Sequence, residues 1–92
     1  MALAEAKEEL KVLNEDFMAF LNADNNEINV VRKNKNDFEL LRPEKELVPE
    51  EAVKHLQQSG DDIIIFNNKT TMSPSVVFRR KSGNFGLIEP EA

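Results

Sequence analysis

The fold is decided by the run Asp62-Ile63-Ile64-Ile65-Phe66 and by the second β-rich stretch that follows it, Ser75-Val76-Val77-Phe78-Arg79-Arg80. Side chains on a strand alternate between the two faces of its sheet. Ile63 and Ile65 therefore point to one face, and Ile64 and Phe66 to the other. Residues 81–84 contain a glycine and predict a tight turn into a third strand over 85–88. These residues predict a strand meander that is apolar on both faces.

A helix and a further strand are predicted upstream of this meander. The triplet Pro49-Glu50-Glu51 is typical of a first helical turn, because proline fits there and acidic side chains complement the positive end of the helix dipole. Gly60 is a natural stop, so we expect a helix over 49–59. Apolar residues alternate with polar ones over 27–33, which predicts a strand. The order of elements predicts an α+β fold with a small, largely antiparallel sheet and one packed helix.

The N-terminal segment has the periodicity of an amphipathic helix. Apolar side chains recur at spacings of three and four from Leu3 to Leu21, which predicts a helix over 3–21. Three explanations stay open: a helix that packs on its own domain, a linker helix that leads in from an upstream domain, or a self-associating helix. We expect two segments, residues 1–26 as amphipathic helix or linker and residues 27–92 as the domain proper.

An apolar sheet with one short helix needs a second cover. The helix over 49–59 can cover one face, and the other could meet the helix over 3–21, an upstream domain or a second copy of the chain. Each large side chain left in water would forgo about 1.5–3 kcal/mol. A domain of this size is marginal alone, and homodimers are the commonest closed assembly. We expect a homodimer through the sheet face that carries Ile63, Ile65, Val76 and Phe78.

The composition argues against enzyme chemistry and against a membrane span. The chain has no cysteine and one histidine, His55, which leaves no thiolate nucleophile, disulfide or multi-histidine metal site. The acidic pairs Glu50-Glu51 and Asp61-Asp62 fit a helix start and a strand entry. No apolar run is long enough to cross a bilayer, and the N-terminus does not resemble a secretion signal. We expect a non-catalytic protein of a reducing compartment, without cofactor, metal or small-molecule substrate.

Nucleic-acid binding is the main alternative that the residues leave open. Of the net charge of −5, residues 1–29 hold two lysines against seven acidic residues, which argues against general affinity for phosphates. The basic cluster Arg79-Arg80-Lys81, however, is flanked by Phe78 and Phe85, and bases interleaved with aromatics can bind RNA by phosphate contact and stacking. Charged residues are also routine at a strand end, so the cluster alone does not decide.

A resemblance to a known family rests on two segments. Gly60 to Phe66 reads Gly-Asp-Asp-Ile-Ile-Ile-Phe, and Val76 to Pro90 reads Val-Val-Phe-Arg-Arg-Lys-Ser-Gly-Asn-Phe-Gly-Leu-Ile-Glu-Pro. They resemble the C-terminal domain of the long-form bacterial ribosome hibernation promoting factor, which reads Gly-His-Asp-Phe-Phe-Val-Phe and Val-Val-Tyr-Arg-Arg-Lys-Asp-Gly-Asn-Tyr-Gly-Leu-Ile-Glu-Pro. The resemblance covers residues 27–91, whereas residues 1–26 are too short to be the ribosome-binding domain of that family.

The resemblance implies a cytoplasmic, non-enzymatic interaction domain. In the family, an upstream domain, absent from this chain, binds the small ribosomal subunit, and the C-terminal domain pairs with a copy on another ribosome. The function implied is homodimerisation that holds two inactive ribosomes together and so silences translation under stress. The expected interface residues are Ile63, Ile65, Val76, Phe78, Phe85 and Leu87, and Arg79, Arg80 and Lys81 are candidates for contact with RNA or the ribosome.

Overall fold

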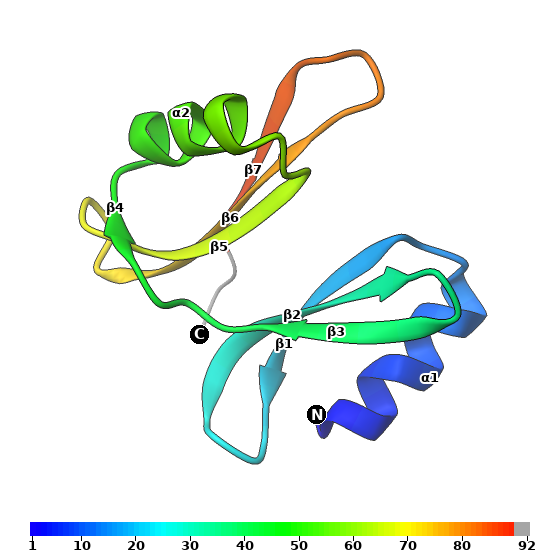
Figure 1. The fold of residues 1–92 in the computed structure, drawn as a ribbon. Coiled ribbons are helices and arrows are strands. Elements are labelled where there is room, and N and C mark those ends of the chain that lie inside the picture. The colour runs from blue at the N-terminus through cyan, green and yellow to red at the C-terminus, as the bar shows by residue number, and fades with distance from the viewer. Residues whose placement is uncertain (90–92) are drawn as a thin grey trace. The chain divides into compact units, whose positions relative to one another are not determined.

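The computed structural model describes residues 1–89, and the chain divides into two compact units at Arg42–Pro43. Each unit consists of one helix and one sheet (Figure 1). The α+β class predicted from the sequence is confirmed, but there are two small sheets where one was expected. The boundary expected at residue 26 falls in the turn between the first two strands of unit 1.

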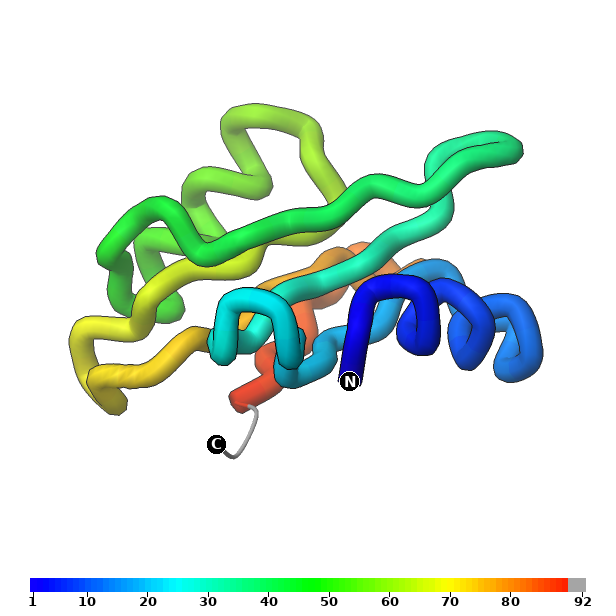
Figure 2. The backbone as a smooth tube through the Cα atoms, turned by 90° about the horizontal axis from the view of Figure 1, so that it is seen from below, coloured from blue at the N-terminus to red at the C-terminus, as the bar shows by residue number. Residues whose placement is uncertain are grey.

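Unit 1, residues 1–42, begins with helix α1 (Leu3–Leu13) and continues with three strands. Strand β1 (Phe17–Asn22) pairs with β2 (Glu27–Asn34), which pairs with β3 (Asp37–Leu41). Both pairings are antiparallel, and the strand order is β1-β2-β3. The course of the backbone from the N-terminus through this helix and these strands can be followed in Figure 2.

Unit 2, residues 43–89 of those described, contains the short strand β4 (Glu46–Leu47), helix α2 (Pro49–Ser59) and three longer strands. These are β5 (Ile63–Asn68), β6 (Ser73–Arg79) and β7 (Phe85–Ile88), in the sheet order β4-β5-β6-β7. The β5–β6 and β6–β7 pairings are antiparallel, whereas β4 is parallel to β5. The predicted helix over 49–59 and the three-stranded meander are confirmed.

The helix predicted over 3–21 is wrong beyond its first three turns. Helix α1 ends at Leu13, where Asn14 adopts the left-handed conformation with φ of 54°. Asparagine tolerates this conformation and is a recognised helix stop. Residues 17–22 then form β1, whose apolar side chains point alternately to the two faces of the sheet. Phe17 and Phe20 imitate the spacing of a helix although both lie on a strand.

The two units have the same core, position by position. In unit 1 the helix packs on the sheet through the buried cluster of Ala6, Leu10, Phe20 and Val31. In unit 2 the corresponding cluster is Ala52, Leu56, Phe66 and Val77. Each residue of the second cluster lies 46 positions after its counterpart in the first. In each unit, therefore, an alanine and a leucine from the helix meet an aromatic and a valine from the two strands that follow the helix.

The local hydrogen bonds repeat with the same spacing. The backbone N–H of Ala2 donates to Glu5 Oε1 at 3.2 Å, and that of Val48 donates to Glu51 Oε1 at 3.0 Å, so both helices begin alike. Both helices also end on a residue with positive φ, Asn14 in unit 1 and Gly60 in unit 2. Units 1 and 2 thus share helix starts and helix stops as well as a core.

Candidate pairing surface

The sheet of unit 2 has one face covered by its own helix and one that is not. Ile64, Phe66 and Val77 belong to the cluster with α2. The strand register places Ile63 opposite Phe78 and Ile65 opposite Val76, and all four side chains alternate with those that meet the helix. Gly86 and Ile88 pair with Phe78 and Val76 and extend this second face onto β7. We call it the open face of unit 2: Ile63, Ile65, Val76, Phe78, Gly86 and Ile88.

Phe85 and Leu87 do not belong to the open face, although the sequence grouped them with it. Leu87 pairs with Val77, and Phe85 packs against the cluster that Val77 forms with α2. Directly paired residues share a face, so both side chains lie on the helix-covered side. Phe85 is half-buried there, and Leu87 is 46% exposed. The six expected interface residues therefore lie on two faces of the sheet, because the register of β7 places Phe85 and Leu87 on the helix-covered face.

The open face of unit 2 is closely packed at the pair formed by Phe78 and Gly86. A Cβ on Gly86 would lie only 2.4 Å from Cζ of Phe78, so the ring extends across the backbone of the neighbouring strand. The guanidinium of Arg80 lies 5.4 Å from the centroid of the same ring. The Phe78 ring thus lies over the glycine backbone, and the Arg80 cation lies on the ring.

Arg79 anchors α2, which separates it from the other two basic residues. Its Nη2 donates to the carbonyl oxygen of Leu56 at 3.1 Å, close to the C-terminus of the helix. Its guanidinium also lies 5.2 Å from the Phe85 ring, and its Nε lies 3.7 Å from Asp62 Oδ1. A cation at this position satisfies a terminal carbonyl and complements the helix dipole. The three basic residues therefore do not form one patch. Arg79 contacts the helix, Arg80 lies on the open face beside Phe78, and Lys81 is exposed in the turn.

Unit 1 has an open face of its own, which the sequence did not reveal. Phe20 and Val31 meet α1, so the alternate residues on β1 and β2 point away from that helix. At its edge, Arg32 Nε donates to Glu39 Oε1 at 2.7 Å across β2 and β3. The apolar residues of this face are Phe17, Ala19, Leu21, Ile28, Val30 and Leu41. A comparison of the chain with itself would have found this face, since Val30-Val31 and Val76-Val77 stand at equivalent positions.

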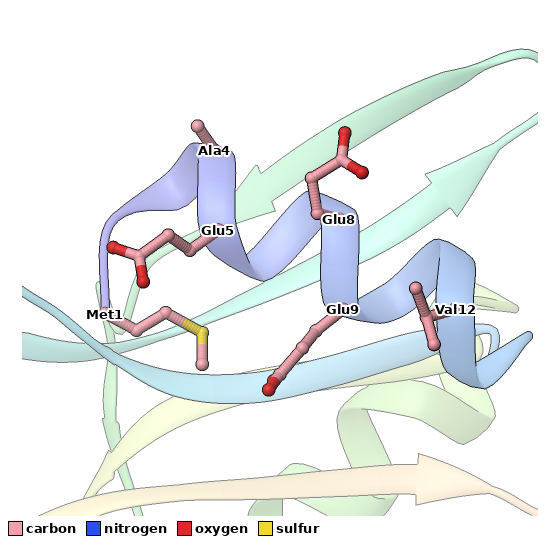
Figure 3. Close-up of a pocket in the computed structure, with 6 residues that line it drawn as sticks. All are labelled: Met1, Ala4, Glu5, Glu8, Glu9 and Val12. Carbon is pink, nitrogen blue, oxygen red and sulfur yellow. The ribbon is translucent and has the colours of Figure 1, made fainter.

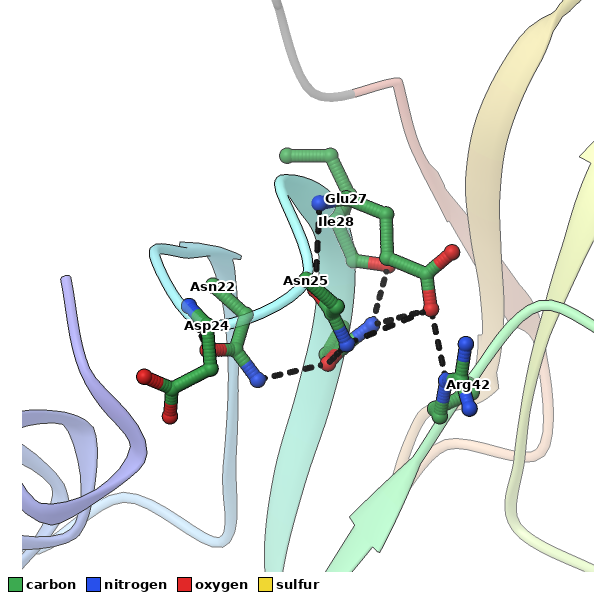
Figure 4. A network of polar contacts seen from close by, with 7 residues as sticks. Asn22, Asp24, Asn25, Glu27, Ile28 and Arg42 are labelled. Carbon is green, nitrogen blue, oxygen red and sulfur yellow. Dashed lines mark hydrogen bonds and ion pairs between the residues drawn. The ribbon is translucent and has the colours of Figure 1, made fainter.

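A network of amides closes the β1–β2 turn of unit 1 (Figure 4). Asn22 Nδ2 donates to Asn29 Oδ1 at 2.9 Å, and Asn25 Nδ2 donates to the same oxygen at 3.0 Å. Asn29 Nδ2 in turn donates to Glu27 Oε1 at 3.2 Å, and Arg42 Nε donates to that oxygen at 2.6 Å. The hydrogen bond from Arg42 lowers the pKa of the Glu27 carboxyl below its ordinary value of 4.5. Through these hydrogen bonds the β1–β2 turn is connected to Arg42 at the end of unit 1.

A shallow depression runs along α1, lined by Met1, Ala4, Glu5, Glu8, Glu9 and Val12, so that its walls come from the helix and the residues that lead into it (Figure 3). No group of three or more metal-ligating side chains occurs within the described range. Neither helix of that range, at 11 residues each, is long enough to span a membrane.

A comparison with known families accounts for both units. The family model described as "Sigma 54 modulation/S30EA ribosomal protein C terminus" matches residues 1–38 and residues 42–87. The first match falls within unit 1, and the second coincides with most of unit 2. The resemblance stated from the sequence is thereby confirmed, and it extends to residues 1–26, which had been assigned to a helix or linker.

Proposed function

Since the chain belongs to the family of the sigma 54 modulation/S30EA ribosomal protein C terminus, whose members are ribosome-associated factors, we propose that it is a non-catalytic pairing module of a ribosome hibernation factor. The module acts through the open face of unit 2, which associates with a second copy of the same fold. The observation that carries this proposal is the apolar character of Ile63, Ile65, Val76 and Phe78 on the side of the sheet opposite α2.

The energetics of the open face support association. Ile63, Ile65 and Val76 are large apolar side chains that are at most 7% exposed, and keeping each of them out of water is worth about 1.5–3 kcal/mol. An antiparallel sheet with one wetted face normally alternates apolar and polar residues, whereas residues 63–66 of β5 and the centre of β6 are apolar on both sides. Two such faces pack at about 10 Å from one another in sheet-on-sheet assemblies.

The sequence predicts a homodimer, in which the second copy of the fold belongs to another chain. Two inactive ribosomes, each bound through a domain outside this chain, would then be held together in the cytoplasm, and translation would be silenced under stress. This form requires a particle of about 21 kDa, twice the 10.5 kDa of one chain.

The experiment that tests the function compares Ile65→Asp, on the open face, with Leu87→Asp, on the helix-covered face. We expect Ile65→Asp to increase binding of a dye for apolar surfaces and to lower the fraction of paired ribosomes in gradients from stressed cells. Leu87→Asp should change neither, because Leu87 is already 46% exposed. If Ile65→Asp matches the wild-type chain in both measurements, the open face is not a pairing surface.

The RNA-contacting alternative depends on Arg79, Arg80 and Lys81 with Phe78 and Phe85. Because Arg79 and Phe85 take part in the packing of α2, this alternative depends on Arg80, Lys81 and Phe78, and the Arg80 guanidinium already lies on the Phe78 ring. This division favours pairing over RNA binding. RNA binding by the chain that weakens steeply with salt, and that Arg80→Ala with Lys81→Ala abolishes, would reverse the preference.

A further inference from the structure

The outer surface of helix α1 is apolar near its C-terminus, unlike that of α2. Val12 is 82% exposed and Leu13 is 58% exposed. The equivalent residues of α2, 46 positions further along the chain, are the polar and exposed Gln58 and Ser59. A surface helix normally turns its apolar side chains to the core and its polar ones to water. Helix α2 follows this pattern and α1 departs from it, although both helices pack on their sheets in the same way.

The shallow depression on α1 begins beside Met1 and reaches Val12 (Figure 3). The carbonyl oxygen of Met1 accepts a hydrogen bond from the N–H of Ala23 at 2.9 Å, which fixes Met1 at the end of β1. Residues four apart are neighbours on a helix surface, so Ala4, Glu8 and Val12 form one row. The depression therefore offers apolar contact at its two ends, with carboxylates between them.

Helix α1 carries its positive and negative side chains on different sides. The Nζ atoms of Lys7 and Lys11 lie 5.9 Å and 5.7 Å from the centroid of the Phe38 ring, so both lysines extend toward β3. Three glutamates line the depression, whereas neither lysine does. Lys11 Nζ also lies 3.7 Å from Glu8 Oε1, but both side chains are more than half exposed and such ion pairs are weak. The depression is therefore negatively charged.

The equivalent surface of α2 has a different charge. Where α1 has Glu8 and Glu9, α2 has Lys54 and His55. The two helices bury the same alanine and leucine against their sheets, so the fold does not require different outer residues. The combination of apolar contact and negative charge thus belongs to α1 alone of the two helices in residues 1–89, and it points to a contact that α1 makes and α2 does not.

We propose that the outer surface of α1 binds a basic amphipathic segment of a partner protein. Apolar side chains of that segment cover Val12 and Met1, and its lysines or arginines face the glutamates between them. Complementary charges across an interface speed association and select the partner. The same glutamates repel the phosphates of RNA, and two copies of α1 would place like charges opposite one another. The contact uses no residue of the open face of unit 2, so it is independent of the proposed function.

The test titrates the full chain with a helical peptide of about 18 leucines and lysines, arranged so that one side is apolar and the other basic. We expect the amide signals of Ala4, Glu8 and Val12 to shift at micromolar peptide concentration. A peptide of the same composition in scrambled order keeps the charge but has no apolar side, and it should bind at least about tenfold more weakly. A single-stranded RNA of similar length should shift none of these signals.

Two pairs of variants locate the contact. Val12→Gln gives α1 the residue of α2 and should weaken binding of the amphipathic peptide about tenfold, whereas Gln58→Ala on α2 should leave it unchanged. Glu9→Gln should weaken binding about threefold, whereas Glu50→Gln removes the same charge from α2 and should not. All four side chains are exposed, so the variants should keep the urea midpoint of the wild-type chain.

Three results would overturn the inference. Equal binding of the amphipathic and scrambled peptides would reduce the contact to general charge attraction. Equal losses in Glu9→Gln and Glu50→Gln, or shifts confined to residues outside α1, would place the contact elsewhere. Shifts of the α1 signals by RNA would make the partner a nucleic acid. None of these measurements concerns the open face of unit 2, so the proposed function is tested separately.

Discussion

Units 1 and 2 are alike where the helix packs on the sheet and different on the face turned away from it. The helix sides use an alanine, a leucine, a phenylalanine and a valine at matching positions. The open faces keep an apolar centre but differ at one edge, where Arg32 and Glu39 stand in unit 1 and Phe78 and Gly86 in unit 2. The contrast separates two faces: the helix side carries the buried core of each unit, and the open face of unit 2 carries the proposed pairing surface.

The largest effect is expected from the leucines at the centre of each core. Leu10→Ala and Leu56→Ala each remove a fully buried side chain at equivalent positions, and each should destabilise its unit by about 2–5 kcal/mol in urea unfolding. Val12→Ala, at an exposed position of α1, is the control and should have little effect. A cost below about 1 kcal/mol for Leu10→Ala alone would mean that unit 1 is not a packed copy of unit 2.

The sequence predicted the features that depend on neighbouring residues and missed those that depend on pairing between residues far apart in the chain. Helix α2 and the turn at Gly83 were predicted correctly, because proline, acidic residues and glycine act on their immediate neighbours. Strand β1 was missed, because Phe17 and Phe20 have a helical spacing and only their pairing with β2 identifies a strand. The expected interface residues lie on two faces of the sheet, since the faces of Phe85 and Leu87 depend on the register between β6 and β7.

The duplication was missed because the residues that match between the two units are scattered along the chain. The positions shared by the two units lie mainly in the core, and most surface positions between them differ. One compact trace remains: residues 40–44 read Leu-Leu-Arg-Pro-Glu and residues 87–91 read Leu-Ile-Glu-Pro-Glu. The second stretch carried the family resemblance, and its similarity to the first would have placed a unit boundary near Pro43.

The next largest effect is expected from the buried asparagine at the end of the first strand after the helix in each unit, Asn22 or Asn68. Asn68 Nδ2 donates to the buried Ser75 hydroxyl at 3.2 Å, and Asn68 Oδ1 accepts from the Thr70 N–H at 2.9 Å. Asn22 has the same two kinds of contact, with Asn29 and the Asp24 N–H. Replacement of either asparagine by alanine should cost about 1–3 kcal/mol in urea unfolding, because the buried partner loses a donor.

The two asparagines should nevertheless differ in cost. In unit 1, Asn29 Oδ1 also accepts from Asn25 at 3.0 Å, so it keeps a donor when Asn22 is replaced. In unit 2, replacement of Asn68 removes the amide that donates to Ser75, and Ser75 does not have a second asparagine as a donor. We therefore expect Asn68→Ala to be more destabilising than Asn22→Ala, and the opposite order would contradict the role assigned to the network. Thr71→Ala, in the exposed part of the same turn, is the control.

An effect no larger than that of the asparagines is expected where the open faces differ. Gly86→Ala places a methyl group against the ring of Phe78 and should cost about 1–3 kcal/mol, because the ring has to move. Glu39→Ala, at the corresponding position of unit 1, removes only a partly exposed ion pair with Arg32 and should cost less than about 1 kcal/mol. The loss at Gly86 should shrink when Phe78 is already alanine, which unfolding of the double variant measures. An unchanged loss would exclude the ring as its cause.

Acid should affect the two units differently through Glu27. Its lowered pKa means that the ionised carboxylate stabilises the folded state, so this contribution is present above pH 4.5 and is lost as the pH falls through the folded-state pKa. Unit 2 has Ser73 at this position. Glu27→Gln should therefore cost up to about 1 kcal/mol at neutral pH and almost nothing at pH 3, by urea unfolding. An equal cost at both pH values would show that the charge on Glu27 does not matter.

The smallest effect is expected in the turns between the first two long strands, and it has the opposite sign. Asn26 in unit 1 and Met72 in unit 2 both adopt positive φ, 56° and 60°. Asparagine tolerates this conformation better than methionine does, and Met72 is 87% exposed, so it contributes little packing. Met72→Asn should therefore raise the free energy of unfolding of unit 2 by about 0.5 kcal/mol, and Asn26→Met should lower that of unit 1 by a similar amount. Equal and opposite changes would mean that the two turns are interchangeable, as expected for copies of one unit; a loss of stability in Met72→Asn would mean that the turn of unit 2 has come to depend on its methionine.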